Sequence, residues 1–71
     1  MDGLTVGRMV HYVRTNGVHN AAIVSNVLNK TQGTVALTVF QLDHNNPVIL
    51  INNVMFSDIK EPGTWHWIEQ A

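Results

Sequence analysis

Short apolar runs alternate with polar punctuation along the whole chain. The runs are separated by clusters of Gly, Asn, Asp and Pro, and ten Val, five Ile and six Thr make 21 of the 71 residues β-branched. This rhythm is typical of short strands joined by tight turns. It predicts five strands, at residues 6–14, 21–28, 34–42, 48–55 and 64–69.

Helical periodicity is missing from the sequence. No segment places apolar residues at i, i+3, i+4 and i+7 over three turns, so no helix longer than a turn or two is expected. The best position for a single 3₁₀ turn is residues 57–61, where Ser57 can cap it. The fold class is therefore all-β.

Side-chain alternation predicts which faces of the strands are covered. In the third strand Val35, Leu37 and Val39 share the expected core face, and Phe40 lies on the other face. The fourth strand is apolar on both faces, with one set formed by Val48, Leu50 and Val54 and the other by Ile49, Ile51 and Met55. A strand of this kind in so small a protein needs cover from outside. The pair Asn52 and Asn53 within it predicts a bulge. The mixed pattern of the first strand does not assign its inner face.

Composition points to self-association. The chain is 45% hydrophobic and only 13% charged, against about 25% charged in an average domain. A chain of about 60 to 70 residues buries only roughly 60% of its unfolded surface, and the absence of Cys excludes disulfides as a supplement. We therefore expect one domain, residues 1–71, that forms a homo-oligomer.

The layout matches SH3-like and Tudor-like small barrels. Five short strands in a chain of this length avoid open edges by curling into a barrel, and glycines at 7, 17, 33 and 63 lie where such a sheet bends or turns. We expect a small five-stranded SH3-like barrel. Fold alone does not carry function.

Three sequence blocks are more distinctive: VGRMVHYV at residues 6–13, AAIV at 21–24 and GTWHW at 63–67. Together they resemble a family of small uncharacterised proteins of bacteriophages and some actinobacteria, which typically begin with a GRIVHYV-like strand and end in GTWHW. The resemblance implies a phage-like origin and no particular activity. Typical members have Pro where Ile68 stands here, and some have a longer loop than residues 15–20, which places a variable binding surface near that loop.

Charge and hydropathy exclude two classes of partner. With a net charge of −1 and no basic run, the chain is not expected to bind long nucleic acid, although a small ligand with one or two phosphates is compatible with it. Its longest apolar stretches, 21–24 and 48–51, are far shorter than the roughly 18 residues of a membrane span, and no export signal is recognisable. We expect a protein of the bacterial host cytoplasm with no membrane partner.

Catalytic motifs are also missing. The chain has no nucleophile elbow, no phosphate-binding Gly-rich loop, no zinc-protease motif and no thiol. Its histidines, at 11, 19, 44 and 66, do not have the spacing of a standard zinc motif, although a site assembled across strands or subunits would not show in spacing. We expect no enzyme, no cofactor and no metal.

Aromatic, histidine and arginine residues gather near the two ends of the chain. Trp65 and Trp67 share one face of the last strand. Both indoles either close the barrel or are buried in a subunit interface, or one of them stacks against a base or another planar ligand. Arg8 has two interpretations: it is an edge-strand residue that is exposed or ion-paired, or its planar guanidinium binds a phosphate. Because first and last strands are neighbours in SH3-like barrels, the predicted ligand-binding residues are Arg8, His11, Tyr12, Phe40, Trp65, His66 and Trp67.

Two hypotheses of function follow. In the first, a homo-oligomeric barrel binds and sequesters a small phosphate-containing ligand, a nucleotide-derived signal of host antiviral defence, in pockets between subunits. In the second, the chain is a protein-binding module that blocks or recruits a host protein, either through the apolar fourth strand or through a Tudor-like aromatic cage of Tyr12, Phe40 and Trp65.

Overall fold

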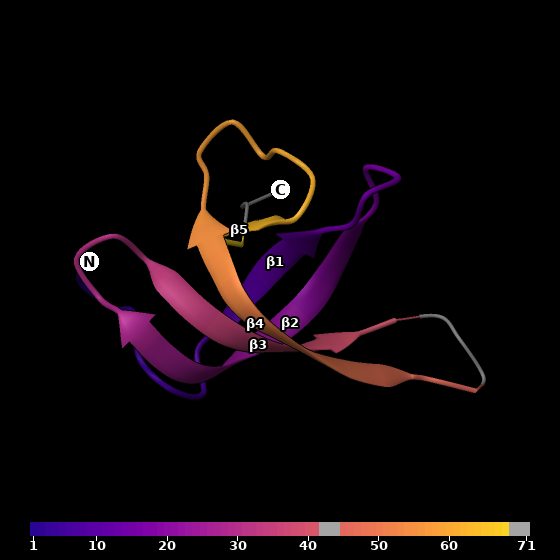
Figure 1. Cartoon of the computed structure of the whole chain (residues 1–71), viewed down its shortest axis with the longest axis horizontal. Coiled ribbons are helices and arrows are strands. Elements are labelled where there is room, and N and C mark those ends of the chain that lie inside the picture. The colour runs from indigo at the N-terminus through magenta and orange to yellow at the C-terminus, as the bar shows by residue number, and fades with distance from the viewer. Residues whose placement is uncertain (42–44, 69–71) are drawn as a thin grey trace.

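The five expected strands form a closed barrel in the computed structural model, which describes residues 1–41 and 45–68 (Figure 1). The strands are β1 (Met9–Val13), β2 (His19–Asn29), β3 (Thr34–Phe40), β4 (Val48–Phe56) and β5 (Thr64–His66). This confirms the all-β class and the small SH3-like barrel. Within these described ranges no helix is long and apolar enough to cross a membrane.

Strand pairing brings the two ends of the chain together. The hairpins β1–β2, β2–β3 and β3–β4 are antiparallel, β5 pairs in parallel with the end of β4, and β5 also pairs antiparallel with β1. The last pairing closes the barrel and sets His11 opposite His66 and Tyr12 opposite Trp65. The prediction that the first and last strands are neighbours is confirmed.

Strand ends differ from the sequence prediction where turns intervene. β1 begins at Met9 rather than at residue 6, and β2 begins at His19, two residues before the predicted start. Gly7 has a φ of 91°, which is outside the strand region, and this conformation delays the start of β1. Residues 42 and 69, the predicted ends of the third and fifth strands, lie outside the described residues.

The predicted 3₁₀ turn at residues 57–61 is replaced by two successive turns. The Lys60 amide donates a hydrogen bond to the Ser57 carbonyl at 3.3 Å, but Lys60 has a φ of 60°, which stops any helical continuation. Pro62 and Gly63 then form a second turn, in which the Thr64 amide donates to the Glu61 carbonyl at 3.2 Å. Pro followed by Gly with a positive φ is the usual composition of a type II turn.

The barrel interior is filled as the third-strand pattern predicts. Val35, Leu37 and Val39 are fully buried, and Phe40 lies outside. At one end of the core Trp65 is fully buried, and its indole Nε1–H donates to the Gly33 carbonyl at 2.6 Å. A buried indole needs such an acceptor, so this bond ties β5 to the β2–β3 turn.

A bulge at Asn52 and Asn53 changes the faces of β4. Between the pairs Leu37↔Ile51 and Val35↔Val54, β4 contains one residue more than β3. Asn53, within this stretch, has a φ of 58°. The bulge is therefore confirmed. It also corrects the predicted division of β4 side chains between the two faces, because the extra residue reverses the inward and outward alternation of the residues that follow. Val54 is buried with the partly buried Ile49 and Ile51, and not on the side of Val48 and Leu50.

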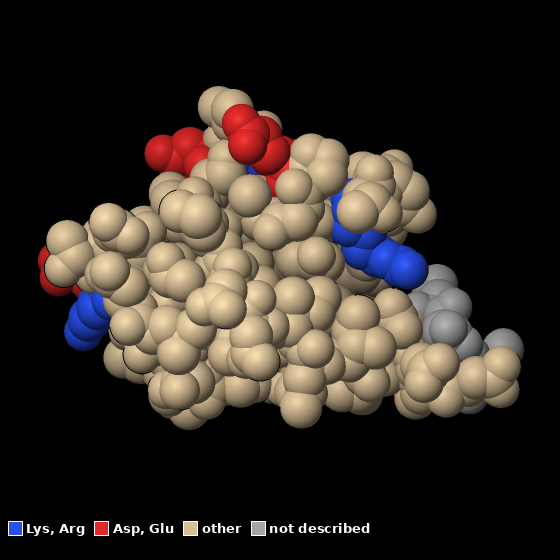
Figure 2. Space-filling model, viewed as in Figure 1, with Lys and Arg blue, Asp and Glu red and all other residues tan. Residues whose placement is uncertain are grey.

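One outer face of the barrel is apolar and uncharged. Register places Met9, Ile23, Thr38 and Leu50 side by side across β1 to β4, and Leu50 is 77% exposed at the end of this row. Phe40 and Val48, which pair with each other, are also exposed. Figure 2 shows a broad surface without charged side chains, which lie at its margins in this view. We refer to Met9, Ile23, Thr38, Leu50, Phe40 and Val48 as the uncharged face.

Candidate functional site

Arg8 and Trp67 form a contact between the two ends of the chain. The Arg8 guanidinium carbon lies 5.4 Å from the centroid of the Trp67 ring, which is within cation–π distance. Trp67 is partly buried and packs its ring against Trp65 at 5.0 Å in an edge-to-face arrangement. An otherwise exposed arginine is thereby held over a ring that the core supports.

The backbone beside Arg8 is anchored and accessible. The Gly7 amide donates to the Val24 carbonyl at 2.8 Å, and the Val24 amide donates to the Arg8 carbonyl at 2.9 Å. A Cβ added at Gly7 would meet no atom within 4 Å. Gly7 is exposed, and the space where its side chain would stand is empty.

The other predicted binding residues divide between the core and the surface. Tyr12 and Trp65 are buried inside the barrel, whereas Phe40 lies on its outer surface. These three residues therefore do not form an aromatic cage, and the Tudor-like version of the protein-binding hypothesis is corrected. The physical reason is the alternation of strand side chains, which sends Tyr12 inward and Phe40 outward. The structure brings the remaining four residues together as two separate pairs, Arg8 with Trp67 and His11 with His66.

The β1–β2 hairpin adds a residue that the predicted site lacked. Its turn closes through the Gly17 amide, which donates to the Arg14 carbonyl, and through Asn16 Oδ1, which accepts from the Val18 amide. The resulting register pairs Val13 with His19. Because His11 pairs with Ala21, His19 is the diagonal neighbour of His11, at a separation that long side chains can bridge.

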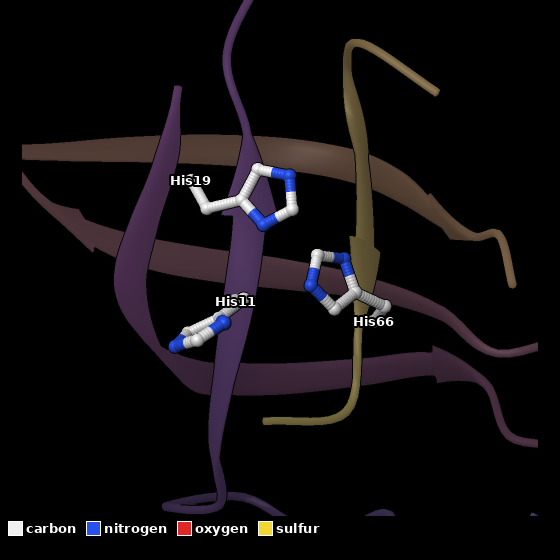
Figure 3. A group of neighbouring side chains, drawn as sticks. All are labelled: His11, His19 and His66. Atoms are coloured by element: carbon white, nitrogen blue, oxygen red, sulfur yellow. The ribbon is translucent and has the colours of Figure 1, made fainter. Parts of the chain in front are cut away.

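His11, His19 and His66 converge from three different strands (Figure 3). Ring centroids are 4.8 Å apart for His19 and His66, 5.5 Å for His11 and His66, and 6.3 Å for His11 and His19. One ring nitrogen from each residue lies within 4.8 Å of the other two. We call these three residues the histidine cluster.

Burial within the histidine cluster is graded. His66 is 3% exposed, His11 is partly buried and His19 is exposed. Val13, the partner of His19 in the sheet, is 1% exposed and follows His11 by two positions, so it shares the outward face of β1. The cluster thus has a buried apolar neighbour, Val13, on the same outer face of the sheet, and its most exposed member is His19.

Sequence reasoning selected His11 and His66 but not His19. Residues 11, 19 and 66 are spaced like no local metal motif, since each lies on a different strand. The signal that could have found His19 is register. A short loop after the first strand, with Asn16 and Gly17 at its turn, places residue 19 diagonally across from residue 11.

Comparison with known proteins identifies no relative: no family model matches the chain, and neither the curated proteins nor the solved structures give a match. The resemblance of the three sequence blocks to phage proteins therefore stays a prediction.

Proposed function

We propose that the protein is a non-enzymatic binding protein that sequesters a small phosphate-containing ligand, of the nucleotide type used as a host defence signal, between subunits of a homo-oligomer. The observation that carries the proposal is Arg8 held over Trp67 beside the open backbone at Gly7. An arginine fork matches a phosphate with two parallel hydrogen bonds. The ring face of Trp67 that Arg8 does not cover is the proposed stacking surface for a base.

Preorganisation supports this use of Arg8. An isolated exposed arginine loses rotamer freedom when it binds an anion, and that loss offsets part of the interaction. Here the guanidinium already rests on the Trp67 ring, and Trp67 rests on the buried Trp65. Part of the Arg8 side-chain entropy is therefore already lost in the free protein, so less is lost when the ligand binds.

The uncharged face supports the oligomer. Charged residues are depleted from the centres of protein interfaces, and an exposed apolar patch on a small soluble domain marks a contact surface. A second copy of the chain is the proposed occupant, because its uncharged face offers the same complementary surface in a two-fold arrangement. The proposed ligand is then held at Arg8 of an associated subunit.

Self-association is the first expected result. Light scattering at micromolar concentration should give a mass of at least twice 7.9 kDa. Leu50→Glu should shift the mass toward 7.9 kDa, because it places a charge in the proposed interface. Ile59→Glu is the matched control, since Ile59 is 76% exposed but lies in the 57–63 connection, and its mass should equal that of the wild type. A monomeric wild type would overturn the inter-subunit site.

Arg8→Ala tests the ligand. Loss of a charge-assisted hydrogen bond to an ionised group costs about 1.5 to 3 kcal/mol, so calorimetry with a panel of linear and cyclic nucleotides should show affinity reduced by about tenfold or more. The melting temperature should stay nearly unchanged, because Arg8 is exposed. Arg14→Ala is the control and should retain wild-type affinity. Equal loss in both variants would indicate general charge attraction instead of a site at Arg8.

A second candidate function is supported by the same uncharged face. Phe40, Val48 and Leu50 are all exposed, so a host protein is a possible occupant in place of a second copy. If wild-type protein binds no nucleotide and remains monomeric but captures one host protein in stoichiometric amount, the protein-blocking function replaces sequestration.

The ligand can be identified without prior choice of a nucleotide. Purified protein is incubated with lysate from phage-infected bacteria, repurified and denatured, and the released small molecules are analysed by mass spectrometry. Arg8→Ala protein treated in the same way is the control. A phosphate-containing molecule released by the wild type and depleted in the variant is the expected outcome, and identical profiles would contradict the proposal.

A further inference from the structure

We propose that His11, His19 and His66 form a binding site for a divalent late transition-metal ion, with zinc as the representative ion. The proposal goes beyond the ligand site at Arg8 and does not depend on it. It replaces the sequence expectation that no metal is bound, which considered only spacing along the chain.

The donor set determines the class of metal. Three imidazole nitrogens are the donors in the cluster, and no carboxylate of the described residues joins them. Hard cations such as Ca²⁺ and Mg²⁺ require oxygen ligands, whereas imidazole suits Zn²⁺, Cu²⁺, Ni²⁺ and Co²⁺. The cluster is therefore suited to the transition ions and not to the hard cations.

The distances are close to those of a bound site. With metal–nitrogen bonds of about 2.0 to 2.1 Å and tetrahedral angles, two ligating nitrogens lie about 3.3 to 3.4 Å apart. The three nitrogens here are within 4.8 Å of one another, so the longest separation must shorten by at most about 1.5 Å. Small side-chain rotations achieve this, and the exposed His19 has the space to make them.

The scaffold holds two of the three ligands firmly. His11 and His66 are directly paired residues of the β1–β5 ladder that closes the barrel, and His66 is almost fully buried. His19 is carried by the β1–β2 hairpin, whose register is set by the turn at Asn16 and Gly17. Two anchored imidazoles and one adjustable imidazole form a site that needs little rearrangement to close on an ion.

The open side of the cluster predicts how the ion is coordinated. Structural zinc sites are closed by four protein ligands, whereas three protein ligands leave one position for water or an exogenous anion. Because His19 is exposed, we expect that fourth position to face solvent. The proposed site is thus an accessible three-histidine site and not a closed structural one.

Calorimetry with zinc chloride on metal-stripped protein tests the proposal. We expect one ion per chain with a dissociation constant below about 10 µM. Removal of outer-sphere partners alone costs about 10- to 100-fold in metal affinity, so His19→Ala, which removes a ligand, should lower the affinity by at least about 100-fold. His19 is exposed, so this variant is expected to fold. Val18→Ala, the exposed neighbour on the same hairpin, is the matched control and should bind zinc like the wild type.

Cobalt provides a second readout that reports geometry. Co²⁺ bound by three histidines and a solvent ligand in a tetrahedral arrangement gives intense visible absorption, which should appear in the wild type and be lost in His11→Ala and His19→Ala. Arg8→Ala should leave both the zinc affinity and the cobalt spectrum unchanged, which separates this site from the proposed nucleotide site. A wild-type dissociation constant above about 1 mM, or zinc affinity that is unchanged in His19→Ala, would overturn the proposal.

Discussion

Leu37→Ala should lower the free energy of unfolding by about 2 to 5 kcal/mol, because it removes the largest of the three fully buried side chains of β3 and leaves a cavity in the barrel. Leu37 lies in the middle of the sheet, paired with Val24 on one side and Ile51 on the other. A closed barrel has little freedom to collapse around the missing atoms, so the loss should lie well above that of a surface change.

Urea unfolding at one fixed protein concentration measures this loss, since association also contributes to apparent stability. Ile59→Ala, at a residue that is 76% exposed, is the control and should change the stability by no more than about 0.5 kcal/mol. Equal stability of the two variants would contradict the core position of Leu37.

Gly33→Ala should cost about 2 to 4 kcal/mol, from two sources that add. Gly33 has a φ of 80°, where a side chain is disfavoured by about 1 to 2 kcal/mol. An added Cβ would also lie 2.9 Å from the Phe56 Cβ and 2.6 Å from the Met1 Sδ. The Met1 side chain can move, but the Phe56 Cβ is fixed by the backbone of β4. Any shift of Gly33 also disturbs its carbonyl, which accepts the Trp65 indole hydrogen bond.

Gly17→Ala separates the two sources. Gly17 has a similar φ of 85°, yet a Cβ there would meet no atom within 4 Å. Its cost should therefore be only the conformational part, about 1 to 2 kcal/mol. Thermal and urea unfolding of the two variants, compared side by side, should show the larger loss for Gly33→Ala. Equal losses would mean that the packing around Gly33 relaxes without cost.

Local pattern was sufficient to predict the strands and the core face of β3. β-branched runs, glycine and asparagine turns and strict alternation are properties of neighbouring residues, so Val35, Leu37 and Val39 were placed correctly without tertiary information. The same reasoning was wrong for the faces of β4 beyond the bulge. A bulge was predicted at Asn52 and Asn53, but the face on which Val54 lies after the bulge is known only from its pairing with β3.

The candidate site was predicted in part, for the same reason. The pairing of His11 with His66, and the contact of Arg8 with Trp67, followed from the neighbouring positions of the first and last strands in small barrels. Whether an aromatic residue is core or surface was not determined by its type. Tyr12 and Trp65 are buried, while Trp67 is partly buried and packs against Trp65. His19 entered the site only through the register of the β1–β2 hairpin.

The amino-acid sequence by itself determined the all-β class, the number of strands, the core face of β3 and the scarcity of charge that leaves an apolar surface. These depend on composition and on contacts between residues close in the chain. Tertiary structure alone decided the register that unites His11, His19 and His66, the phase of β4 and the placement of Arg8 over Trp67. Each of these depends on the register between paired strands, in the hairpins β1–β2 and β3–β4 and in the pairing of β1 with β5 at the other end of the chain. A shift of one residue in such a register would turn every side chain of the strand to the opposite face.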